Sequence, residues 1–147
     1  MMNDLTPHTI AVVEEKVIGY ALAMPPVFRL QIPELRAMFE LLDKVEWHGK
    51  YLCDYNYLVM GQICIDRQWR RKGIFRSLYN QFFQTHSAGF DLVITEVATR
   101  NTRSLNAHLA LGFVRAHTYL EEGVEEWVVL VYDFQKSLYI SDSTDAK

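Results

Sequence analysis

Residues 57–98 read YLVMGQICIDRQWRRKGIFRSLYNQFFQTHSAGFDLVITEVA, and this stretch decides the fold. Its two ends, 57–66 and 90–98, are rich in the apolar and β-branched residues typical of strands. Between them, apolar side chains recur with a period near 3.6, which predicts a helix from about residue 72 to 86. The repeat consists of Phe75, Leu78, Tyr79, Phe82 and Phe83. A strand, a helix and a strand in this order predict a βαβ unit whose two strands are parallel neighbours.

Upstream of this unit the pattern is weaker but regular. Two β-rich runs, 9–13 and 17–24, flank the polar trio Glu14-Glu15-Lys16 and predict a hairpin. Residues 33–47 then carry apolar side chains at helical spacing, which predicts a helix that begins near Pro33. The upstream part therefore adds two strands and a helix.

Downstream of the unit, a short helix is predicted over 102–111. Asn101 stands where an N-cap belongs, and Gly112 stands where the helix should end. Strands follow at 114–119 and 127–134. Together with the upstream elements, these segments predict an α/β fold with a mixed sheet.

Composition limits the possible function classes. Half of the 147 residues are hydrophobic, which suits a single domain, 1–147, with a core from about 9 to 134 and a frayed polar tail at 141–147. The net charge of −3 argues against tight nucleic-acid binding. The sequence contains no membrane-length apolar run and no signal-peptide pattern. The histidines and the two cysteines lack metal-ligand spacing, so no metal site is predicted, and reduced thiols fit a cytoplasmic protein.

The loop between the first parallel strand and its helix is strongly basic. It reads RQWRRKGI over residues 67–74 and leads into a helix N-terminus, where unpaired N–H groups and the helix dipole attract anions. Gly73 allows a close approach of the backbone to a ligand. A pyrophosphate would fit such a loop, and a solvated basic turn is the simpler alternative. The loop is neither a Walker P-loop nor a Rossmann fingerprint, because the required glycine patterns are absent.

Two motifs in this region resemble a known family. Residues 70–75 (RRKGIF) resemble motif A of the GNAT superfamily of acetyl-CoA-dependent N-acetyltransferases, written Q/R-x-x-G-x-G/A. Arg70 and Gly73 match that pattern, and Phe75 stands where it has Gly or Ala. Residues 101–113 (NTRSLNAHLALGF) resemble motif B, in which an Asn is followed by a short helix that closes on Gly-Phe. Both motifs occur in the family order on the predicted strand–helix–strand–helix frame.

The resemblance implies a GNAT-like acyl-CoA N-acyltransferase fold, with coenzyme A held between two diverging parallel strands. The backbone around Ile63–Ile65 would bind the pantetheine arm and the thioester carbonyl, and the amides of 71–75 would hold the pyrophosphate. Asn101 and Ser104 would contact the pantetheine or the adenosine part. The set of residues predicted to bind acetyl-CoA is Ile63, Ile65, Arg70, Arg71, Lys72, Gly73, Ile74, Phe75, Asn101 and Ser104.

The N-terminal part departs from the superfamily. Its members usually begin with a strand and one or two helices, whereas only eight residues precede Thr9 here. We therefore predict a fold that lacks these first elements, with either the segment 25–55 or a partner subunit walling the acceptor site. An uncovered sheet edge is normally protected, which predicts a homodimer.

Two carboxylates are candidate general bases. Glu96 lies on the second parallel strand, where some members of the superfamily carry a catalytic glutamate, and burial in a cleft can raise the pKa of a carboxyl toward neutrality. A glutamate that faces solvent or pairs with an arginine is the simpler alternative. Asp66 is the second candidate, and its simpler role is to cap the end of the strand.

Three further side chains are candidates for the chemistry. His108 lies where the superfamily usually has a tyrosine that protonates the leaving thiolate, so we predict that it is the general acid. A buried histidine bonded to the backbone is the alternative. Tyr119 is a second candidate acid or a core aromatic residue, and Cys64 is a candidate nucleophile.

The sequence thus predicts an N-acetyltransferase that moves an acetyl group from acetyl-CoA to a primary amine by direct attack in a ternary complex. The alternative is a non-catalytic acyl-CoA-binding or regulatory module on the same fold. The acceptor stays open among small-molecule amines, polyamines, amino acids and peptide N-termini, because a fold does not determine its substrate.

Overall fold

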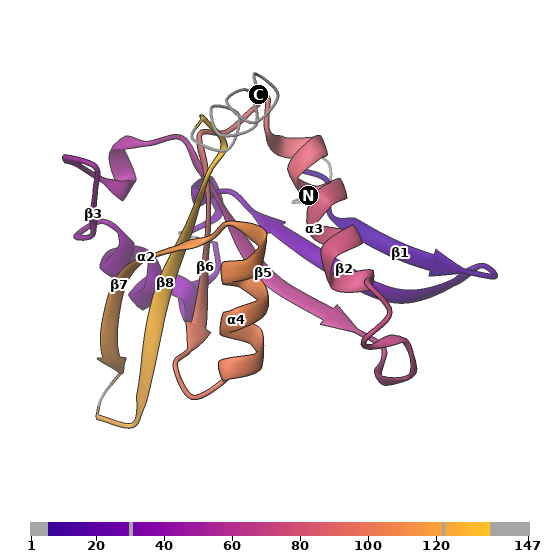
Figure 1. Cartoon of the computed structure of the whole chain (residues 1–147). Coiled ribbons are helices and arrows are strands. Elements are labelled where there is room, and N and C mark those ends of the chain that lie inside the picture. The colour runs from indigo at the N-terminus through magenta and orange to yellow at the C-terminus, as the bar shows by residue number, and fades with distance from the viewer. Residues whose placement is uncertain (1–5, 30, 122, 136–147) are drawn as a thin grey trace, which may run out of the picture.

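The computed structural model describes residues 6–29, 31–121 and 123–135. Within these ranges, six strands form one sheet in the order β1-β2-β5-β6-β8-β7 (Figure 1). The strands are β1 (Thr9–Val13), β2 (Lys16–Met24), β5 (Tyr57–Ile65), β6 (Leu92–Ala98), β7 (Val114–Glu121) and β8 (Glu125–Asp133). All neighbours pair antiparallel except β5 and β6, which are parallel. The mixed sheet and the βαβ unit predicted from the sequence are confirmed.

Helices cover both faces of the sheet because alternate residues of its central strands point to opposite sides. On one face, α3 (Ile74–His86) packs against β1, β2 and β5, and α4 (Thr102–Leu111) packs against β6. On the other face, α2 (Arg36–Leu42) and the small hairpin β3 (Glu46–Trp47) and β4 (Lys50–Tyr51) form a second cluster. The alternation is visible in β8, where Val128 and Leu130 belong to the first cluster and Val129 and Val131 to the second.

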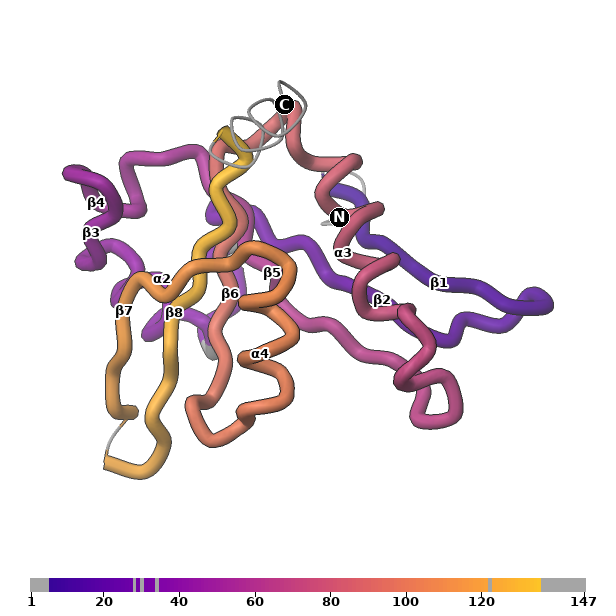
Figure 2. Tube along the Cα trace, viewed as in Figure 1, coloured from indigo at the N-terminus to yellow at the C-terminus, as the bar shows by residue number. Residues whose placement is uncertain are grey.

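The two parallel strands part after only three residue pairs, which end at Val59 and Ile94. Gly61 is skipped in the pairing of β5 with β2, where Leu22 faces Gln62 and the next residue faces Met60. Such an extra residue bends a strand away from its neighbour. Beyond this point β5 continues with β2 while β6 continues with β8, so the two strands diverge (Figure 2).

The segment before β5 differs from its prediction. The helical repeat at 33–47 predicts one helix, whereas the structure has a 3₁₀ turn at Pro33–Leu35, α2 up to Leu42, and then β3 and β4. His48 and Gly49 connect β3 and β4 with φ values of 48° and 88°, the geometry of a two-residue hairpin turn. This turn places Trp47 in the second core cluster, where it is 7% exposed. Burial of a large aromatic side chain thus overrides the local helical pattern.

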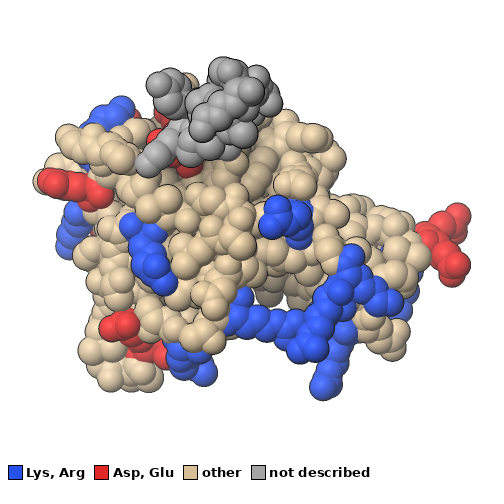
Figure 3. Space-filling view, viewed as in Figure 1, with Lys and Arg blue, Asp and Glu red and all other residues tan. Residues whose placement is uncertain are grey.

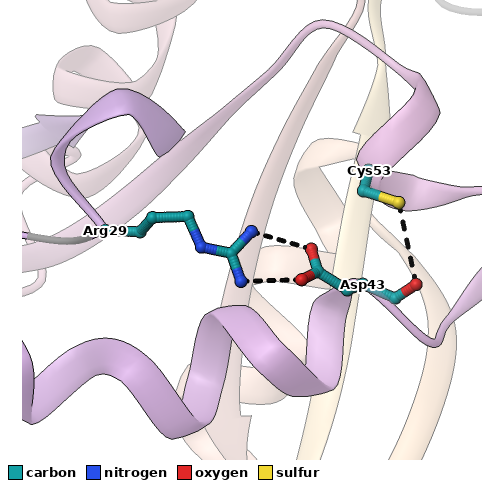
Figure 4. A network of polar contacts seen from close by, with 3 residues as sticks. All are labelled: Arg29, Asp43 and Cys53. Carbon is teal, nitrogen blue, oxygen red and sulfur yellow. Dashed lines mark hydrogen bonds and ion pairs between the residues drawn. The ribbon is translucent and has the colours of Figure 1, made fainter.

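A bidentate ion pair ties the chain after β2 to the end of α2 (Figure 4). Arg29 donates two hydrogen bonds to the Asp43 carboxylate, with N···O distances of 3.0 and 2.6 Å. The Cys53 thiol also reaches the backbone oxygen of Asp43, at 3.7 Å. The pair is partly exposed, so its contribution to stability is at most about 1 kcal/mol. The pair links the 3₁₀ turn after β2 to the C-cap residue of α2.

The structure leaves some of the sequence predictions untested. The frayed tail at 141–147 lies outside the described residues. β1 is an edge strand, and Ile10 and Val12 on it are 57% and 50% exposed, but the homodimer stays a prediction. No helix in the described ranges is long and apolar enough to cross a membrane. Both cysteines, Cys53 and Cys64, are free and exposed.

We expect Gly112→Ala to lower the free energy of unfolding by about 1–2 kcal/mol. Gly112 ends α4 with a φ of 113°, and a Cβ there would lie 3.2 Å from Cε2 of Tyr132. Gly89→Ala is the matched control, since its Cβ would meet only the His86 carbonyl oxygen, at 3.9 Å. Urea titration followed by circular dichroism measures both variants. Equal stability of the two would contradict the assignment of a strained cap.

Candidate functional site

Two adjoining hollows lie where β5 and β6 diverge. The first has a volume of about 430 Å³ and is lined by Ile63, Cys64, Ile65, Trp69, Arg70, Arg71, Gly73, Ile74, Phe75, Asn101, Arg103, Ser104 and Ala107. The second has a volume of about 640 Å³ and is lined by Met60, Gly61, Gln62, Ile63, Thr95, Glu96, Val97, Ala98, Arg100, Asn101, Ser104, His108, Glu125 and Trp127. Because Ile63, Asn101 and Ser104 line both, the hollows form one continuous cleft.

The structure brings the predicted acetyl-CoA-binding residues together at the first hollow. All of them line it except Lys72, whose ammonium group lies 5.1 Å from the centre of the Trp69 ring. The predicted catalytic residues Glu96 and His108 line the second hollow. Sequence reasoning missed Arg103, which lines the first hollow from the first turn of α4. Arg103 could have been found from the sequence, because it stands two residues after the capping Asn101 and therefore in the first turn of the predicted helix.

The loop from β5 to α3 is shaped to present backbone N–H groups. The Asp66 carboxylate accepts a hydrogen bond from the backbone N–H of Gln68 at 3.1 Å and so caps the 3₁₀ turn Arg67–Trp69. Arg71 and Gly73 then adopt positive φ values of 63° and 80°. Gly73 is the N-cap of α3, and a Cβ there would meet nothing within 4 Å. The open helix N-terminus therefore has the geometry and the dipole of an anion site.

Positive charge gathers around this helix N-terminus (Figure 3). In the space-filling view, Lys and Arg side chains border the hollow below α3. Arg70 is held in place because its Nε donates to the Ile65 carbonyl oxygen at 3.2 Å. Arg71 and Arg103 line the hollow from α3's loop and from α4. The arginine charges and the N-terminus of α3 therefore border the same hollow.

The N-terminus of α4 borders the same cleft. The Asn101 side chain accepts a hydrogen bond from the backbone N–H of Ser104 at 3.2 Å, which is the predicted N-cap. The cap fixes Asn101 and Ser104 at the boundary between the two hollows. They are therefore placed to contact a ligand that extends from the basic loop into the second hollow.

Glu96 is a half-buried carboxylate in the second hollow. The Tyr119 hydroxyl donates to its Oε2 at 2.9 Å, while its Oε1 is buried and has no hydrogen-bond partner among the described residues. Burial raises the pKa of Glu96 to about 6, against the lowering effect of the Tyr119 hydrogen bond. A carboxyl with this pKa is ionised at neutral pH and still basic enough to accept a proton. Asp66, the other candidate base, is engaged as a cap.

His108 is buried between α3 and α4 and is 2% exposed. Its Nδ1 lies 2.8 Å from the Ser104 carbonyl oxygen, which can only accept, so Nδ1 carries the proton. Its Nε2 lies 2.6 Å from the Tyr79 hydroxyl, which donates to it. Burial lowers the pKa of His108, so the ring is neutral at pH 7. This geometry argues against the predicted acid role, because both ring nitrogens are already bonded within the protein.

Phe75, where motif A has Gly or Ala, packs against the same histidine. Its ring lies edge-on to His108 and to Tyr79, with a centroid distance of 5.1 Å in each case. The residue also lines the first hollow. The large side chain therefore fills space between α3 and α4 and leaves the positive-φ turn before it intact.

Comparison with known proteins agrees with this geometry. The family model of the Acetyltransferase (GNAT) family matches residues 2–113. The protein belongs to the GNAT acetyltransferase family. No curated protein matches its sequence.

Solved structures share the fold at low sequence identity. An acetyltransferase structure is 17% identical with a TM-score of 0.62, over 85% of this chain and 68% of that one. The NatC complex bound to Gag peptide and CoA is 15% identical with a TM-score of 0.62, over 90% and 75%. A Bacillus anthracis protein in complex with acetyl coenzyme A is 16% identical with a TM-score of 0.57, over 84% and 60%. The chain thus spans less than two thirds of the Bacillus protein, and these likenesses establish the fold.

We expect His108 to be neutral at pH 7, with its proton on Nδ1 and a pKa below 6.5. Long-range ¹⁵N–¹H correlation spectra across pH 5–8 distinguish the two tautomers and give the pKa. A proton on Nε2, or a pKa at or above 6.5, would restore the acid role.

Proposed function

We propose that this protein is an N-acetyltransferase that transfers the acetyl group of acetyl-CoA directly to a primary amine. One observation supports this most: a single cleft joins a basic helix N-terminus at one end to a half-buried carboxylate at the other. The first end suits a pyrophosphate, and the second suits proton removal from an amine. The bound CoA and acetyl-CoA of two fold relatives lend support to the donor.

The donor would bind along the diverging edge of β5. Backbone amides of residues 71–75 and the side chains of Arg71 and Arg103 would hold its pyrophosphate. Ile63–Ile65 would bind the pantetheine arm through backbone groups, since the parallel pairing of β5 with β6 has already ended at Val59. The same backbone N–H groups are the candidate donors to the oxyanion that forms on the thioester carbonyl.

Glu96 would act on the acceptor. The amine nitrogen must lose a proton before or while it attacks the thioester, and an ionised carboxylate with a pKa of about 6 accepts it directly or through a water molecule. The leaving thiol resembles a cysteine thiol, with a pKa of about 8.5, so it can leave as a thiolate and take its proton from solvent. The neutral, doubly bonded His108 is not required in this scheme.

The rival proposal is a non-catalytic acyl-CoA-binding or regulatory module. It is favoured by His108, because the usual tyrosine acid is replaced by a neutral side chain whose one N–H proton is bonded to the Ser104 carbonyl oxygen. The two proposals differ in turnover. An enzyme releases free CoA thiol from acetyl-CoA only when an amine is present, whereas a binding module retains acetyl-CoA unchanged.

Calorimetric titration with acetyl-CoA and CoA tests the donor site. We expect Arg71→Glu and Gly73→Asp each to weaken binding by about tenfold or more, because each places a negative charge beside the pyrophosphate. Arg115→Glu on β7 is the matched charge reversal outside both hollows and should change the affinity by less than about twofold. Equal losses in all three variants, or no binding by the wild type, would refute the donor site.

The pH dependence of kcat/KM tests Glu96. With an acceptor amine whose own pKa lies below about 5, we expect kcat/KM to rise through pH 6, because only the ionised carboxylate is a base. Glu96→Gln should lower kcat about a hundredfold or more and leave acetyl-CoA affinity unchanged. Asp66→Asn is the comparison for the second candidate. Full activity of Glu96→Gln would disprove the assigned base.

A further inference from the structure

Tyr119 reaches Glu96 across an intervening strand. It lies on β7 opposite Trp127 of β8, while Glu96 lies on β6 opposite Val129 of β8. The phenol therefore crosses the face of β8 to place its hydroxyl 2.9 Å from Oε2 of Glu96. The His117 ring stacks beside Tyr119, at 6.4 Å between centroids and 16° between planes. Sheet register and a neighbouring ring thus fix the direction of the phenol.

The two oxygens of the carboxylate are made unequal by this contact. Oε2 accepts a hydrogen bond from the tyrosine hydroxyl, and Oε1 is buried without a hydrogen-bond partner in the described part of the chain. Burial and the adjacent carboxylate raise the pKa of the Tyr119 phenol, so it remains protonated and donates over the whole working range of pH. The contact therefore holds the carboxylate in one orientation, with Oε2 bonded to the phenol and Oε1 turned into the protein.

We propose that Tyr119 is a positioning residue for the reaction: its hydroxyl holds Oε2 of Glu96, and this fixes the carboxylate at the second hollow and limits how strongly it takes the proton from the acceptor amine. This proposal rests on the proposed function, because it assumes that Glu96 is the base. Tyr119 itself transfers no proton, in contrast to its earlier role as a candidate acid.

The surroundings of Glu96 determine the direction of the effect. Burial and the neighbouring Glu121 raise its pKa, and the Tyr119 hydrogen bond lowers it. Other charged or titratable groups that face the second hollow are His108 from α4 and the pair of Arg100 with Glu125, whose atoms are 2.6 Å apart. The residues that β5 contributes to the hollow are uncharged. Removal of the phenolic hydroxyl therefore removes the contact that lowers the pKa of Glu96, and burial and Glu121 then raise this pKa further.

The test is the variant Tyr119→Phe, which keeps the ring and removes only the hydroxyl. In ¹³C-glutamate-labelled protein, with Glu96→Gln used for assignment, we expect the pKa of Glu96 to rise by about one unit in the variant. The acid limb of kcat/KM should move by the same amount, so that activity falls about fivefold at pH 6 and hardly at pH 8. The KM for acetyl-CoA should not change. Tyr51→Phe on the exposed β4 is the matched control and should alter none of these values.

Labelling with 3-fluorotyrosine gives a second measurement that does not depend on the variant. Fluorination makes the phenol a stronger donor, so the pKa of Glu96 should fall in the labelled wild type and stay unchanged in labelled Tyr119→Phe. An unchanged or lowered pKa of Glu96 in Tyr119→Phe, or an unmoved acid limb, would overturn the proposal. Activity that survives in Glu96→Gln would instead defeat the base assignment, and the carboxyl titration would still report whether Tyr119 controls Glu96.

Discussion

The early separation of β5 from β6 is the constraint on which the rest of this structure depends. Parallel strands normally continue to bond along their length, but here the pairing ends at Val59 and Ile94. The extra residue Gly61 keeps β5 bonded to β2, and full antiparallel pairing keeps β6 bonded to β8. Beyond Val59 and Ile94, β5 therefore bonds to β2 and β6 bonds to β8, and the two strands no longer bond to each other. The inner backbone edge of β5 is left free to bond a ligand, which is otherwise an unfavourable state for a strand in the middle of a sheet.

The same separation explains why one cleft offers two chemical environments. Helices that follow parallel strands begin at the carboxyl ends of those strands, so α3 and α4 both direct their N-termini into the opening. Their dipoles and arginines make that end positive. Glu96 lies on the wall made by β6, and its side chain shares a face with Ile94 and with Val129, its partner on β8. The basic helix N-termini and the Glu96 carboxylate thus lie on opposite faces of the sheet.

Local sequence patterns predicted the parts of the fold that local interactions determine. The period of α3, the Asn101 cap and the αL residue Gly112 each act within a few residues, and the structure has them where they were predicted. The prediction that a helix continues to the end of the repeat at 33–47 was wrong, because Trp47 is buried by tertiary packing rather than by its neighbours in sequence. Likewise, the sequence could group the residues predicted to bind acetyl-CoA because their motifs are contiguous, and all of them except Lys72 line one hollow. It could not predict the partners of the two catalytic candidates, since Tyr119 and Tyr79 come from other elements, 23 and 29 residues away.

The two departures from the family motifs are one structural unit. Phe75 replaces a small residue in motif A, His108 replaces the usual tyrosine in motif B, and their rings are 5.1 Å apart between α3 and α4. The bulk of Phe75 occupies space beside the helix face where His108 lies, and the histidine turns its Nε2 to Tyr79 instead of to the cleft. A tyrosine at position 108 would have to compete with the buried Tyr79 hydroxyl for the same space. Under the proposed function, this arrangement would leave the proton of the leaving thiol to come from solvent and Glu96 as the residue that acts on the acceptor amine.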